Sequence, residues 1–115
     1  MTLEQRRAAN AWNCAQGCTK EYANRAKALP ALIMNSGLMQ VLAFCHEKGG
    51  THEQVAVHLR SWLRQRFGNR IITDAFEGVM LVLQEADAQF YQQVNAEAFA
   101  WLRWLRQMAA ASAVD

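Results

Sequence analysis

The sequence has few residues that interrupt helices or cross-link chains, with one proline, six glycines and three cysteines in 115 residues. So little proline and glycine, beside an apolar share of 52%, excludes an intrinsically disordered chain. The odd number of cysteines, without the spacing of a disulfide framework, indicates reduced thiols in a cytoplasmic protein. A chain of this length can bury enough surface to fold without a disulfide or a metal. We therefore expect one domain that spans residues 1–115.

Long hydrophobic runs are also missing. No stretch approaches the roughly eighteen consecutive apolar residues that a membrane span requires. The first seven residues, MTLEQRR, are polar and lack the apolar segment of a signal peptide. We therefore expect a cytoplasmic protein that does not contact a membrane.

A strong excess of charge of one sign is absent too. Twelve basic against ten acidic residues give a net charge of +2, which does not identify a nucleic-acid-binding protein. The distribution is more informative, because seven of the twelve basic residues lie in two stretches, residues 20–27 and 60–70. Glu21 is the only acid in either stretch. The sequence therefore predicts local basic faces on a protein of nearly neutral net charge.

Helix-forming patterns fill most of the chain. Twenty alanines are present, and no segment alternates apolar and polar residues long enough for a strand. Capping patterns at Thr2, Thr51 and Asp87, a start signal at Asp74, and a chain restart at Pro30 mark the helix starts. We predict an all-α fold, a compact bundle of five to six mostly antiparallel helices. The expected helices cover about residues 3–27, 31–35, 38–48, 51–67, a segment from 74 onward, and 88–111.

The sequence contains no recognisable catalytic or metal-binding pattern. Cys14 and Cys18 lie one helical turn apart, but the chain has no C-x-x-C pair of the kind that usually begins a zinc site. Cys45 and His46 are adjacent, and adjacent helical residues do not face each other. No phosphate-binding loop, nucleophile elbow or H-E-x-x-H motif occurs. We expect no enzyme activity, no metal and no cofactor.

Glu97 lies on the apolar arc of the last expected helix, between Phe90 and Trp101. A carboxylate buried alone is costly, so it requires a partner of opposite charge. We expect a salt bridge to a basic residue of a neighbouring helix, in preference to an acid–base role.

The basic residues form separate clusters on the expected helices, and Phe99 is the one large apolar side chain on the polar arc of the last helix. Arginine beside an exposed aromatic suits contact with an RNA backbone or stacking on a base. The same combination is equally typical of a protein interface. For any single basic residue, exposure to solvent on a charged helix face is a sufficient explanation. Phe99 is the candidate for a partner interface. The candidate RNA-binding residues are Lys20, Lys27, Arg60, Arg64, Arg66, Arg103 and Arg106.

Three stretches resemble the signatures of a known family. They are LPALI at 29–33 with NSGL at 35–38 and LAF at 42–44, then HL at 58–59 with WL at 62–63, and EAFAWLRWLR at 97–106 after Tyr91. In this order and chain length they resemble the small subunit of the Cmr complex, the type III-B CRISPR effector. The resemblance covers nearly the whole chain, and the three stretches together are more specific than any one.

The resemblance implies an all-helical, non-catalytic protein whose copies stack along a filament of backbone subunits. The partners it implies are the other Cmr subunits, above all the backbone subunit, further copies of the same chain, and the guide RNA and target RNA. Target cleavage in such complexes belongs to the backbone subunit. Two alternatives stay open: a helical protein–protein adaptor without RNA contact, and a small redox or metal protein that uses Cys14, Cys18 and Cys45.

Overall fold

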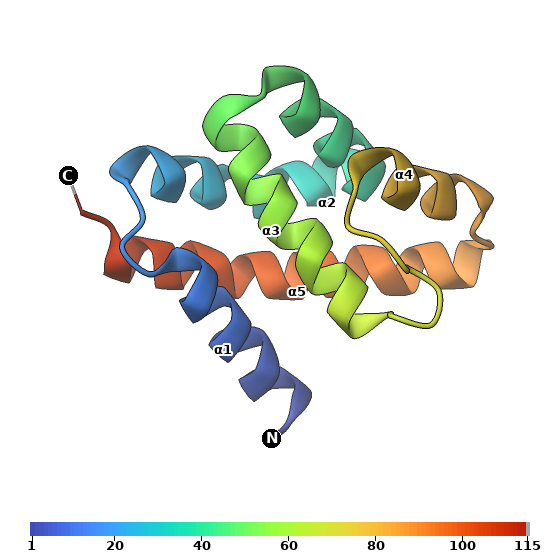
Figure 1. Ribbon diagram of the computed structural model, residues 1–115, viewed down its shortest axis with the longest axis horizontal. Helices are drawn as coiled ribbons and strands as arrows, with labels where there is room; N and C mark the ends of the chain where they lie inside the picture. The colour runs from blue at the N-terminus through green and yellow to red at the C-terminus, as the bar shows by residue number, and fades with distance from the viewer. Residues whose placement is uncertain (115) are drawn as a thin grey trace.

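Five helices make up the computed structural model, which describes residues 1–114 (Figure 1). Within this part of the chain the only strand-like pairing is an isolated bridge between Thr19 and Val114. The prediction of an all-α fold is confirmed. The helices are α1 (Leu3–Ala15), α2 (Lys20–Lys48), α3 (Gly50–Arg66), α4 (Phe76–Glu85) and α5 (Ala88–Ser112).

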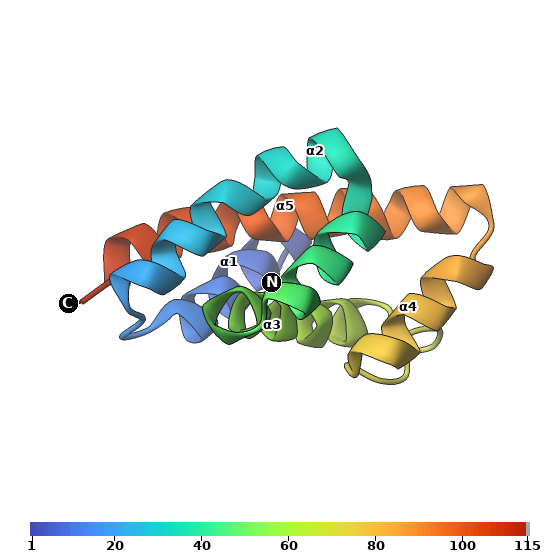
Figure 2. The same ribbon diagram turned by 90° about the horizontal axis from the view of Figure 1, so that it is seen from above.

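Helix α5 is the centre of the packing and runs along the longest axis of the molecule, with α1, α2 and α3 against it (Figure 1). The first arm of α2 runs antiparallel to it (Figures 1 and 2). Val94, Trp101, Leu102 and Leu105 are fully buried on α5 and join one continuous core. The apolar arc predicted for the last helix is confirmed at Val94, Trp101 and Leu105, and Leu102 is buried in addition.

The helix expected over residues 3–27 is two helices. Helix α1 ends at Ala15, and Gly17 takes φ +66°, a conformation that side chains with a Cβ rarely adopt. The hydroxyl of Thr19 then accepts a hydrogen bond from the Tyr22 amide at 3.0 Å and begins α2. Helix α1 buries Ala11 and Ala15, whereas Trp12 on the same helix is exposed.

Pro30 does not restart the chain, as the sequence suggested, because α2 runs through it. The interruption lies at Gly37, with φ 81° and ψ 164°. Beyond it the free amide of Leu38 donates to Oδ1 of Asn95 at 2.8 Å, and that of Met39 donates to the Tyr91 hydroxyl at 3.3 Å. Side chains of α5 therefore cap the second arm of α2, a long-range contact that no local pattern contains.

Helix α2 is long and apolar enough, by length and composition alone, to meet the criterion for a membrane span, contrary to the expectation from the sequence. The fold gives another reason for its composition. Leu29, Ile33, Leu38 and Leu42 are buried in the core, and the bend at Gly37 divides the helix into two arms. Neither arm reaches the roughly 20 residues of a straight span.

Besides Pro30, the sequence predicts four helix starts, and two of them are confirmed together with their capping residues. Thr2 forms a capping box with Gln5, and Oδ1 of Asp87 accepts from the Phe90 amide at 2.8 Å. At Thr51 and Asp74 the predicted helices are present within two residues of the expected start, but neither side chain caps its helix. Gly49 precedes α3, while Thr51 donates to Glu21 at 2.8 Å, and α4 begins only after Ala75.

Candidate nucleic-acid and protein interfaces

Glu97 is buried, with 4% of its surface exposed, and it is paired as predicted. Its two carboxylate oxygens accept from Nε and Nη2 of Arg7 at 2.7 and 2.8 Å, and Nε1 of Trp62 donates at 3.0 Å. Nε of Arg66 lies 3.3 Å away. Burial alone would raise the pKa of Glu97, but the hydrogen bonds from Arg7 and Trp62 and the charges of both arginines lower it. The ionised carboxylate therefore joins α1, α3 and α5.

Arg60 is not on an exposed face, so the prediction of an exposed Arg60–Arg64 patch is wrong for this residue. Only 4% of its surface is exposed. Its guanidinium donates to both oxygens of Glu53 at 3.3 and 3.0 Å and to the backbone oxygen of Asp74 at 2.8 Å. The loop before α4 covers this side of α3, and a helical wheel cannot show that. Arg60 is therefore a structural residue.

The other two candidate RNA-binding arginines between residues 60 and 70 also differ from each other. Arg66 is partly buried, with its guanidinium 4.7 Å from the Phe67 ring centre in addition to its ion pair with Glu97. Arg64 is exposed over 54% of its side chain and lies 3.9 Å from the Asp74 carboxylate. Of the three candidates Arg60, Arg64 and Arg66, only Arg64 is an exposed cation.

A groove between α2 and α5 brings together three of the predicted residues, Phe99, Arg103 and Arg106. Its volume is about 770 Å³. Phe99 is partly buried against the core, and the Arg103 guanidinium lies 5.9 Å from its ring centre. Met34, which the sequence analysis did not single out, is 72% exposed at this groove. The full lining is Glu4, Pro30, Ala31, Met34, Phe99, Ala100, Arg103, Trp104, Arg106 and Gln107.

Lys20 and Lys27 lie seven residues apart on α2, which places them on one face of the helix. Ala31 and Met34 follow on the same face by helical spacing, and all four residues are exposed. The two lysines therefore form a basic extension of the α2 side of the groove. We call Lys20 and Lys27 the α2 basic face.

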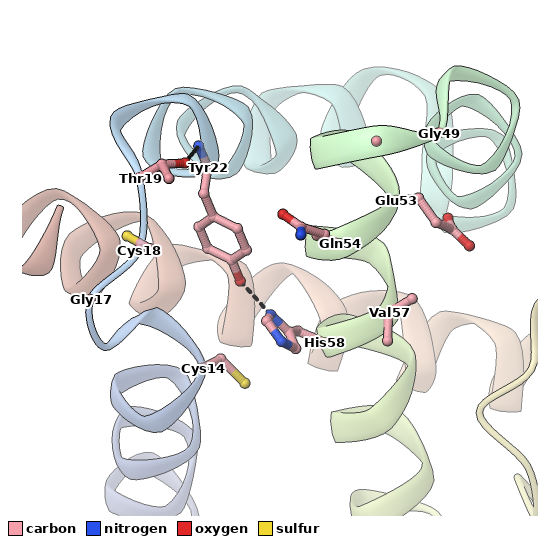
Figure 3. A pocket seen from close by; sticks show the side chains of 11 residues that line it. Cys14, Gly17, Cys18, Thr19, Tyr22, Gly49, Glu53, Gln54, Val57 and His58 are labelled. Carbon is pink, nitrogen blue, oxygen red and sulfur yellow. Dashed lines mark hydrogen bonds between the residues drawn. The ribbon is translucent and has the colours of Figure 1, made fainter. Parts of the chain in front are cut away.

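A second cavity, of about 520 Å³, lies between the α1–α2 turn and α3 (Figure 3). Tyr22 and His58 point toward one another in it, with the hydroxyl 2.6 Å from Nδ1 of the ring. Burial raises the pKa of Tyr22 and lowers that of His58, so both favour their neutral forms. The pair connects α2 to α3.

Cys14 and Cys18 also line this cavity. Burial raises the pKa of both thiols, and it raises that of Cys45 to about 11. Thiols of raised pKa are poor nucleophiles and poor metal ligands. Within residues 1–114, no group of three His, Cys, Asp or Glu side chains is arranged to hold a metal ion. The redox or metal alternative therefore has no support from this arrangement.

The fold and its surface define a small all-helical protein with an apolar groove flanked by arginines and a basic face beside it. The family model described as CRISPR-associated protein (Cas_Cmr5) matches residues 3–112, so the chain belongs to the Cmr5 family of CRISPR-associated proteins. The crystal structure of a CRISPR-associated Cmr5 family protein from Thermus thermophilus superposes with a TM-score of 0.78. The two sequences are 25% identical, over 99% of this chain and 100% of the other. A comparison with curated proteins gives no match.

Proposed function

We propose that the chain is a non-catalytic small subunit of a cytoplasmic type III-B CRISPR effector complex, which acts in antiviral defence. It stacks along the filament of backbone subunits, beside the duplex of guide RNA and target RNA. Membership of the Cmr5 family supports the assignment to a Cmr complex. The polar network around Glu97 joins α1, α3 and α5, and that around Arg60 holds the loop before α4 against α3, so both serve the fold.

The exposed lysines of the α2 basic face are the observation that supports direct contact with RNA. Lys20 and Lys27 are exposed on one side of a helix, where they can neutralise adjacent phosphates of an RNA backbone. Arg64 is a further exposed cation on α3. Arg103 and Arg106 differ from these three because they flank an apolar groove, a setting typical of protein interfaces. The contacts are independent of RNA sequence, because a guided complex accepts any guide.

Charge reversal of the α2 basic face tests RNA contact in the assembled complex. The Lys20→Glu/Lys27→Glu variant should assemble normally and retain target RNA less well. The slope of log affinity against log salt should fall by about one for each cation lost. The matched control is Lys48→Glu/Arg70→Glu, an equal change on exposed residues outside the α2 basic face. Unchanged retention in the lysine variant would show that this face does not contact RNA.

The second candidate is a protein–protein adaptor without RNA contact, which the arginine-flanked apolar groove favours. Crosslinking of labelled target RNA in the assembled complex separates the two functions. Adducts at or beside Lys20 and Lys27 support RNA contact. Adducts confined to other subunits support the adaptor.

A further inference from the structure

The acidic residues are separated from the basic ones along the chain. Residues 71–102 contain five acids and no lysine, arginine or histidine. Glu97 is buried, so the surface charge of this segment comes from the other four: Asp74, Glu77, Glu85 and Asp87. These four lie on α4 or within two residues of its ends. Helix α4 is therefore an acidic element of a protein whose net charge is positive.

One face of α4 has a regular pattern of exposed side chains. Glu77, Leu81 and Glu85 are exposed at intervals of four residues, with Leu81 exposed over 56% of its surface. This spacing places the three on one stripe about 12 Å long. A leucine with carboxylates beside it makes an acidic, partly apolar surface, which is complementary to an apolar site that carries cations. We call these three residues the α4 stripe.

The groove between α2 and α5 has the complementary features. Met34 and Phe99 provide apolar surface, and Arg103 and Arg106 lie three residues apart on the same face of α5. Glu4 is the one acid of the lining, and Nε1 of Trp104 donates a hydrogen bond to it. Because Glu4 is bound to Trp104, Arg103 and Arg106 keep the positive charge that an acidic partner requires.

The α4 stripe and the groove are on different sides of one molecule. Figure 2 shows α4 at the lower right and the first arm of α2, along which the groove lies, toward the upper edge, with α5 between them. None of the residues that line the groove belongs to α4. The stripe can therefore fill a groove only in another copy, and such a contact repeats from copy to copy in one direction.

We propose that the α4 stripe of one copy docks into the α2–α5 groove of the next. Leu81 packs on Met34 and Phe99, and the carboxylates of Glu77 and Glu85 pair with Arg103 and Arg106. This inference rests on the stacking part of the proposed function and names the surfaces that make it. The contact is small, so it is weak in the isolated chain and is reinforced where a filament holds the copies in line.

Paired charge reversals test this contact in the full-length chain by sedimentation at about 1 mM and low salt. Glu77→Arg/Glu85→Arg and Arg103→Glu/Arg106→Glu should each weaken self-association about tenfold, because each faces like charge with like. A mixture of the two variants should restore it, since every stripe then meets a groove of opposite charge. Leu81→Ala should weaken it without any change of charge.

The matched control for the mixture is the Lys48→Glu/Arg70→Glu variant, which has the same net charge as the groove variant and alters exposed residues outside the groove and outside the α2 basic face. It should self-associate like the unaltered chain. Mixed with the α4 variant, it should restore no more association than the unaltered chain restores. The two proposals stay separable, because RNA retention is measured in the assembled complex and self-association in the isolated chain.

Three results would overturn the α4–groove contact. They are a monomeric unaltered chain at this concentration, a mixture that stays dissociated, and variants that associate normally. A groove variant that keeps self-association but loses RNA in the complex would assign the groove to RNA.

Discussion

At the scale of single residues, the carboxylate of Glu97 is the most constrained charge in the protein. Arg7, Arg66 and Trp62 surround it from two other helices. Removal of one member of a buried ion pair leaves the other charges without compensation, which costs more than the pair contributes. The sequence shows that Glu97 needs a partner of opposite charge, because this acid lies on the apolar arc of its helix. Which arginine supplies it depends on how the helices pack.

The substitution Glu97→Gln should lower the free energy of unfolding by about 3 kcal/mol, because both guanidiniums then face a neutral amide. Chemical denaturation with urea measures the change. Glu85→Gln is the control, since Glu85 is exposed and its loss of charge should change stability by less than about 0.5 kcal/mol. Equal effects of the two substitutions would contradict the role of the network.

The same carboxylate gives a pH dependence. Hydrogen bonds and nearby positive charges lower the pKa of Glu97 in the fold, and those from Arg60 and His46 lower the pKa of Glu53. In each case burial opposes the shift. The unfolded chain therefore binds protons first as the pH falls. The stability from these groups is complete above the ordinary glutamate pKa and is lost as the pH falls through the lower folded value.

Urea midpoints measured from about pH 7 down to pH 3 should fall below about pH 5. The fall should be shallower in Glu97→Gln, because one of the two titrating groups is gone. A midpoint that is constant across this range, or identical profiles for the two proteins, would show that the pKa of Glu97 is not lowered.

At the scale of elements, the bend in α2 decides where its apolar residues go. Gly37 has φ 81° and ψ 164°, a region open essentially to glycine, and a Cβ there would lie 3.3 Å from the Tyr91 hydroxyl. The sequence indicates a break near Ser36 and Gly37 but also places one at Pro30, which the structure does not have. Pro30 lowers the helix propensity locally. The helix nevertheless continues through it, because α2 is packed against α5.

The substitution Gly37→Ala should destabilise the protein by about 2 kcal/mol, because alanine is strained at this φ and crowds Tyr91. Thermal unfolding gives the change in Tm. Ser36→Ala, at the exposed neighbouring position, is the control and should leave Tm nearly unchanged. An unaltered Tm in Gly37→Ala would mean that the bend tolerates other residues.

Helix α3 shows why the predicted basic cluster is dispersed. Helical spacing places Arg60 and Arg64 near each other on the wheel, but the loop before α4 covers one and leaves the other exposed. A wheel describes one isolated helix, and burial depends on what packs against it. The exposed residues of the groove, above all Met34, are equally invisible to sequence, because α2 and α5 meet only in the folded chain.

At the scale of the whole molecule, one apolar core joins the helices, and three free cysteines form no cross-link. Hydrophobic burial is then the main source of stability, and we expect it to suffice without a disulfide or a metal. EDTA and dithiothreitol should each leave the thermal unfolding curve unchanged. A fall in Tm with either reagent would revive the redox or metal alternative.

The sequence by itself determined the helical class, most helix positions, the pairing of Glu97 and the family. These depend on local propensity, periodicity and residue order, which one chain carries in full. Tertiary structure alone decided that Arg60 is buried, that α2 continues through Pro30, and that Phe99, Arg103 and Met34 share a groove. The physical reason is that burial and side-chain convergence depend on contacts between residues far apart in the chain, and those contacts exist only after the helices have packed.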